Sequence, residues 1–240
     1  MTPWVPALAA VAAGAIAAVS GFGIGSLLTP ILLLSFAARD AVALVSVPHA
    51  VASAVRLGKL WPDVHWPTFR QFGVASAFGG LAGALLQARL GGTALTIVLG
   101  LLLVLAGSGE LARRRLPLPQ TPLWRLFGGV SSGFFGGLVG NQGGLRSAAL
   151  LGFRLAPREL VATATASAVI VDVARLPVYL YTAGPVLASH VPLIAATSTG
   201  VVAGTFVGVP VLRRVPENTY RQMIGLLLVV LGAALIVMAM

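Results

Sequence analysis

The chain has 240 residues, of which 58% are hydrophobic and only 9% are charged, and its mean hydropathy is +0.96. Soluble domains carry roughly 25% charged residues, so this composition excludes a soluble enzyme or a nucleic-acid-binding domain. The net charge of +10 comes from residues that sit in short gaps between apolar runs, as expected for the anchors of a membrane protein. No cysteine is present, which excludes disulfides and thiolate chemistry.

Apolar segments follow one another along most of the chain. A membrane-spanning helix needs about 20 apolar residues. Six segments meet this length: 41–60, 68–89, 93–112, 158–181, 187–212 and 219–240. Two more stretches, 4–36 and 123–153, are too long for one helix. The first has no Lys or Arg before its apolar run, so we expect a structural segment and not a cleaved signal peptide.

Glycine-rich patches interrupt both long stretches near their middle. The first patch runs over residues 20–26 and the second over 140–144. Glycine costs about 1 kcal/mol per position in a helix interior, so both patches predict helix breaks. The segments that follow, 27–36 and 145–153, are then only about half a bilayer long.

The two halves of the chain are related by an internal repeat. A shift of 119 positions places Gly25 on Gly144 and the Arg56-Leu57 pair on Arg175-Leu176, and a shift of 125 relates the later segments. Internal repeats of this kind are common in secondary transporters. We therefore predict a first half over residues 1–112, a cytoplasmic linker over 113–122 and a second half over 123–240.

The distribution of basic residues predicts that the halves are inverted. If each broken stretch enters the membrane and returns, eleven Lys and Arg residues face one side and only Arg39 and Arg89 face the other. This bias agrees with the positive-inside rule. The expected fold is an all-α integral membrane protein of two inverted repeats, each with a Gly-broken helix pair plus three transmembrane helices, and with both termini outside.

The breaks are also the candidate binding site. Non-helical backbone within a membrane must be buried in protein or line a cavity, and helix N-termini favour anions. Both patches carry polar neighbours, although close helix packing is an alternative explanation of the glycines. The candidate substrate-binding residues are Gly21, Gly23, Gly25, Ser26, Asn141, Gln142, Gly143, Gly144, Arg146 and Ser147.

Four further ionisable residues lie within apolar segments and are candidates for gating or coupling. Asp172 and Arg175 are three residues apart on one helix face, so they can pair, either as a structural ion pair or as a gate. Arg56 is close to Lys59 and can snorkel to the surface. His49 is either a hydrogen-bonded core residue or a proton-coupling group.

No catalytic or metal-binding pattern is found in the sequence. HExxH and P-loop motifs are missing, and the three histidines are far apart. We therefore expect a protein that is not an enzyme, with no metal, no cofactor and no nucleic-acid partner.

Both halves contain a glycine motif followed by an arginine-acid pair. The residues are Gly21-Phe-Gly23-Ile-Gly25 with Pro30 and Arg39-Asp40-Ala41 in the first half, and residues 133–144, Arg158-Glu159 and 162–165 in the second. These motifs resemble those of the sulfite exporter TauE/SafE family of membrane transporters. The resemblance spans nearly the whole chain. It implies transport of sulfite and sulfonates across the cytoplasmic membrane, mostly outward.

The sequence thus predicts a secondary transporter, an exporter of a small sulfur oxyanion or organosulfonate such as sulfite, with alternating access around a midplane site. The alternatives are a small-anion channel that uses the same residues and a membrane scaffold whose glycines only pack helices. The expected partners are the anion and the lipid bilayer, and the apolar outer faces are compatible with a homodimer. A bacterial-type cytoplasmic (inner) membrane is the expected location.

Overall fold

The structure is a computed structural model that describes residues 4–20, 23–112, 121–141, 143–212 and 216–240. All regular elements in these ranges are helical, and no strand occurs among them. The predicted all-α fold is confirmed. Of the expected linker, residues 113–120 lie outside the described ranges, and Pro122 already belongs to a helix whose N-cap is Thr121.

The first half forms a series of long and short helices. They are α1 (Trp4–Ser20), α2 (Ile24–Leu33), α3 (Ala38–Leu60), η1 (Trp61–Asp63), α4 (Trp66–Thr68), η2 (Phe69–Gly73), α5 (Val74–Gln87) and α6 (Gly92–Ala112). The expected span 68–89 is divided, because η2 is a π-helical turn that joins α4 to α5. The break between α1 and α2 falls in the glycine patch, as predicted.

The second half follows the same order with fewer interruptions. Its helices are α7 (Pro122–Val139), α8 (Gly143–Leu151), α9 (Pro157–Ser189), α10 (Val191–Leu212) and α11 (Glu217–Ala239). The break between α7 and α8 lies at the second glycine patch. Helix α9 continues past the expected end at residue 181 and kinks at Ala183, where φ is −129° and ψ is 17°.

The outer surface of the bundle is apolar. Helices long and apolar enough to cross a membrane include α6 and α9, and α2 belongs to a set of shorter apolar helices. Large side chains are exposed on the outside, such as Leu8, Phe78 and Leu105 at 68–72% of their surface. Apolar side chains exposed over so many helices are expected where lipid, and not water, surrounds the protein.

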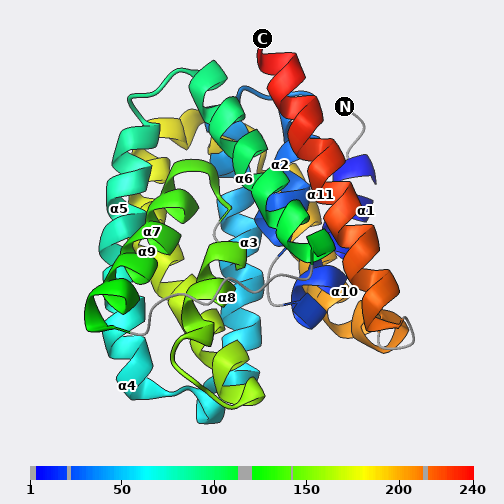
Figure 1. Ribbon diagram of the computed structural model, residues 1–240. Helices are drawn as coiled ribbons and strands as arrows, with labels where there is room; N and C mark the ends of the chain where they lie inside the picture. The colour runs from blue at the N-terminus through cyan, green and yellow to red at the C-terminus, as the bar shows by residue number, and fades with distance from the viewer. Residues whose placement is uncertain (1–3, 21–22, 113–120, 142, 213–215) are drawn as a thin grey trace.

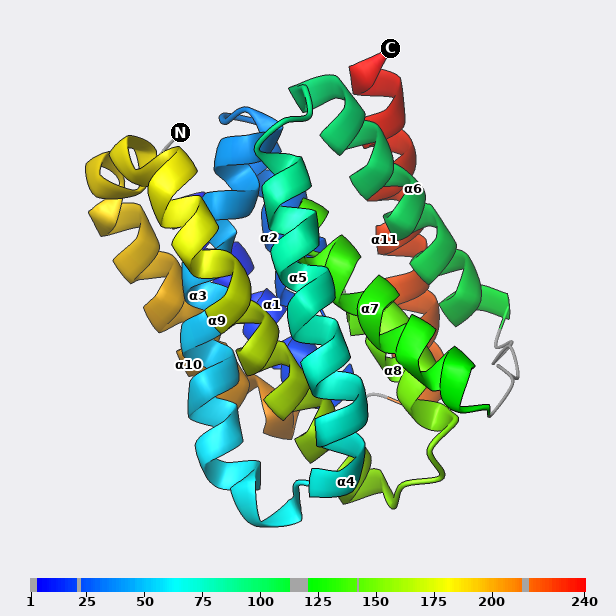
Figure 2. The same cartoon turned by 90° about the vertical axis from the view of Figure 1, so that its left-hand side faces the viewer.

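The helix contacts pair the two halves reciprocally. Helix α1 packs on α10 while α7 packs on α5, α3 lies against α9, and α6 lies against α11 (Figures 1 and 2). The start of α1 and the end of α11 lie at the same end of the bundle (Figure 1). In the first two pairs, the first helix of one half (α1 or α7) packs on the penultimate helix of the other half (α10 or α5).

Glycine contacts repeat the same pattern at the level of single residues. A Cβ on Gly14 would lie 2.1 Å from the Val201 carbonyl oxygen, and one on Gly133 would lie 1.8 Å from that of Ser76. The shifts of 119 and 125 positions turn the first contact into the second. A duplication related by a twofold axis gives such paired contacts. The inversion of the halves across a membrane stays a prediction.

These contacts predict a clear difference between two glycine substitutions. Gly133→Ala is expected to destabilise the protein by about 1–3 kcal/mol, because the new methyl group would overlap the backbone of α5. Gly58→Ala should be neutral or stabilising, since no atom lies within 4 Å of that Cβ. Thermal unfolding of both variants in the same detergent tests this, and equal midpoints would contradict it.

Candidate functional site

The two helix breaks meet inside the bundle. Gly23 caps α2 with φ of 137°, and Gly140 ends α7 with φ of 73°, a left-handed conformation that favours glycine. A Cβ on Gly25 would lie 2.0 Å from the Gly140 carbonyl oxygen. Ser26 Oγ donates a hydrogen bond of 2.9 Å to Asn141 Oδ1. Ser26 and Asn141, which are 115 positions apart in the sequence, thus connect the two breaks directly.

The structure places the predicted binding residues in different surroundings. Gly25, Ser26 and Asn141 form the contact between the breaks, so close packing accounts for Gly25. Gly144 is half-buried and its nearest neighbour is the Ala106 side chain of α6, 3.7 Å from an added Cβ. Gly143 and Ser147 are half-buried on α8, outside the pocket described next. Gly21 and Gln142 lie outside the described residues.

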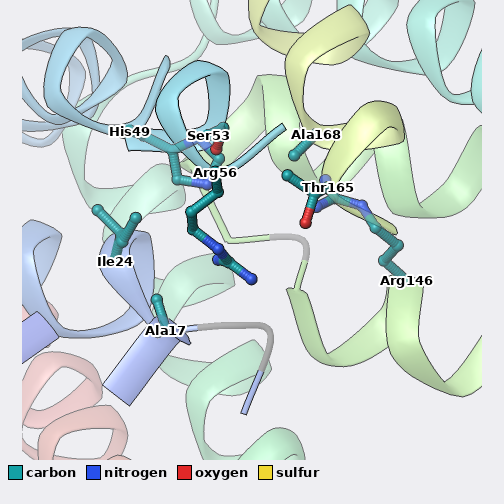
Figure 3. Close-up of a pocket in the computed structure, with 9 residues that line it drawn as sticks. Ala17, Ile24, His49, Ser53, Arg56, Arg146, Thr165 and Ala168 are labelled. Carbon is teal, nitrogen blue, oxygen red and sulfur yellow. The ribbon is translucent and has the colours of Figure 1, made fainter. Parts of the chain in front are cut away.

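A polar pocket lies beside the first break. Helix α3 contributes His49, Ser53 and Arg56, while Arg146 comes from α8 (Figure 3). The side chains of Arg56 and Arg146 enter it from different helices (Figure 3). The remaining lining residues are Ala17 of α1, Gly23 and Ile24 at the start of α2, and Thr165 and Ala168 of α9.

Arg146 is the most unusual group in this pocket. The side chain is buried, with 3% of its surface exposed, yet its Nε and Nη2 atoms have no hydrogen-bond partner among the described residues. Leaving a buried charged donor unpaired costs more than leaving a neutral one unpaired. A ligand with acceptor oxygens in the pocket would satisfy these donors.

The buried carboxylate of Asp172 is already paired with Arg175 and His49. Its Oδ1 accepts from Arg175 Nε at 2.9 Å and lies 2.7 Å from Nη2, and its Oδ2 lies 2.8 Å from His49 Nδ1. The pairing of Asp172 with Arg175 was expected from their spacing, but the link to His49 on α3 was not. Among the described residues that line the pocket none is acidic, so Arg56 and Arg146 keep the pocket cationic.

Arg175 and Tyr179 also hold the end of α7. Arg175 Nη1 donates to the Gly136 carbonyl oxygen at 2.5 Å, and the Tyr179 hydroxyl donates to that of Gly137. Both side chains are fully buried. The last turn of α7, which leads into the second break, is therefore fixed to α9 by side-chain hydrogen bonds.

Sequence reasoning missed several residues of this site. Ser53 and Thr165 line the pocket, and Tyr179 binds the end of α7, although none was a candidate. The internal repeat contained a signal for one of them, because the 119-residue shift places Ser53 on Asp172. Among the described residues, no group of three or more His, Asp or Glu side chains is placed to hold a metal ion.

The fold and the pocket define a class of protein. A bundle of apolar helices with two broken helices meeting beside a buried cationic pocket is the architecture of a multi-pass membrane protein with an internal polar site. The model of the family described as sulfite exporter TauE/SafE matches residues 6–235. The chain therefore belongs to the TauE/SafE family, which implies a membrane transporter of sulfite or related anions.

No curated protein and no solved structure matches the chain closely enough to be counted as similar.

Proposed function

We propose that this protein is a secondary transporter that exports a small sulfur oxyanion or organosulfonate, such as sulfite, across a bacterial-type cytoplasmic membrane. The observation that carries the proposal is the buried guanidinium of Arg146. Within the described part of the chain, its Nε and Nη2 lack partners and the pocket has no acidic lining residue. An oxyanion supplies several acceptor oxygens and negative charge, and arginine binds such groups through paired N–H donors.

Three features of the pocket would act on the anion together. Arg146 would bind its oxygens, Arg56 would add a second positive charge, and Ser53 and Thr165 would add hydroxyl groups. The N-terminus of α2, at Gly23 and Ile24, would contribute the partial positive charge of a helix start. Ser26 and Asn141 would hold the two breaks together and so keep α2 and α8 beside the same pocket.

Alternating access of the two halves is the mechanism that the reciprocal packing favours over a static pore. Transporters built from repeats move by rocking one unit against the other around a fixed site. An inside-negative membrane potential drives an anion outward with about 2.3 kcal/mol per charge at 100 mV. We propose that the termini face the outside.

Sulfite release from proteoliposomes tests this function. The reconstituted protein should release internal sulfite with a rate that saturates, and related oxyanions, tested as sulfoacetate and sulfate, should compete with it. A channel would show a rate that rises linearly with concentration and no countertransport. Correctly folded protein that moves none of these anions would contradict the proposal and favour a scaffold.

A further inference from the structure

Three positions of the repeat form different structures in the two halves. The 119-residue shift places Ala17 on Gly136, Ser53 on Asp172 and Arg56 on Arg175. In the second half these positions form a closed cluster. In the first half they line the pocket.

The closed cluster of the second half is tightly bonded. Arg175 donates to the carbonyl oxygen of Gly136, in the last turn of α7, and is paired with Asp172 at 2.7 Å. Gly140, four positions after Gly136, is the C-cap of this helix. Arg175 thereby ties the helix that precedes the second break to α9.

In the first half, the pocket lies between Ala17 of α1 and the two corresponding residues of α3, Ser53 and Arg56. Ala17 lies in the last turn of α1, as Gly136 does in α7, and Arg56 extends from α3 into the pocket that Ala17 also lines (Figure 3). Ser53 stands where the second half has Asp172, and the structure gives Arg56 no equivalent ion pair with any described residue. Its guanidinium remains for the anion in the state that the structure shows.

We propose that Arg56 and Arg175 exchange these arrangements during transport, so that Arg56 is the residue that releases the anion. In the opposite state Arg56 donates to the carbonyl oxygen of Ala17, while Arg175 leaves Gly136. The anion then loses one of its two cationic partners as the pocket beside α1 closes. This inference rests on the proposed transport function and adds the step that ends anion binding.

The exchange predicts opposite effects for the two arginines on the balance between states. Removing the Arg175 hydrogen bond destabilises the state shown here, and removing the Arg56 hydrogen bond destabilises the opposite state. One hydrogen bond to a charged group corresponds to a shift of about tenfold in such an equilibrium. A role for either arginine in folding alone would not give opposite signs.

Accessibility of the pocket provides the measurement. The chain has no native cysteine, so Ala168→Cys introduces a single thiol at a pocket-lining position. The rate of its reaction with methyl methanethiosulfonate, a small neutral reagent, reports how much of the protein has an open pocket. The rate should fall by up to about tenfold with Arg175→Gln, and it should return toward the starting value when Arg56→Gln is added. Arg158→Gln, at an exposed side chain on α9, is the control and should change nothing.

A rate in the double variant equal to or below that of Arg175→Gln overturns the exchange. If Arg175→Gln fails to fold, as judged by gel filtration, Tyr179→Phe weakens the same attachment to α7 and takes its place in both combinations. Saturable sulfite release by the wild type together with rates that change in the same direction would overturn the exchange and leave the transport function intact. The predicted rates in a protein that releases no sulfite would support the exchange and contradict the function.

Discussion

Arg146→Ala is expected to lower sulfite efflux by at least about 30-fold. The substitution removes a buried cation whose Nε and Nη2 atoms have no partner within the described protein. Removing one member of a buried, hydrogen-bonded charge pair costs about 2–5 kcal/mol, and 1.4 kcal/mol corresponds to a factor of ten. The loss should appear in kcat/KM of efflux from proteoliposomes.

Two further variants, one at Arg146 and one at an exposed arginine, separate an effect on anion binding from an effect on folding. Arg146→Lys keeps the charge but loses the planar pair of donors, so it should retain part of the activity. Arg89→Ala removes an exposed arginine and should leave efflux unchanged. Efflux that is equally fast in wild type and Arg146→Ala would show that the pocket arginine does not touch the anion.

Asp172→Asn is expected to reduce the free energy of unfolding by about 3–5 kcal/mol. Asp172 and Arg175 are each 1% exposed, and the change leaves the guanidinium without its carboxylate. Breaking a buried pair by removing one partner is strongly destabilising for this reason. Denaturant unfolding in detergent measures the change.

A double variant and a surface control make this prediction specific. Asp172→Asn combined with Arg175→Gln should cost clearly less than the sum of the single changes, because the two residues interact directly. Asp63→Asn removes a carboxylate 3.3 Å from the exposed Arg158 and should cost about 0–1 kcal/mol. Additive losses in the double variant would contradict a coupled buried pair.

The sequence predicted the local features of the site better than its long-range contacts. Glycine patches predicted both helix breaks, because glycine is unfavourable in a helix interior wherever the chain lies. The spacing of Asp172 and Arg175 predicted their pairing, since residues three apart share a helix face. Arg146 was a candidate from its place just after the second break.

Contacts between distant helices were beyond such reasoning. His49 lies 123 positions from Asp172, and their proximity depends on how α3 packs against α9. Snorkelling was the first interpretation of Arg56, yet its side chain lines the pocket beside α1. The position of a long side chain depends on neighbouring helices, and hydropathy along one segment contains no information about them. Ser53 and Thr165 were missed for the same reason.

Equilibrium binding of sulfite to the purified protein measures the proposed anion site separately from the transport step. We expect isothermal titration calorimetry to give saturable binding of about one sulfite per chain to the wild type. Arg146→Ala should bind at least about 30-fold more weakly, because it loses a buried charge pair with the anion. Equal affinity in the two proteins, or no binding by folded wild type, would contradict an anion site built around Arg146.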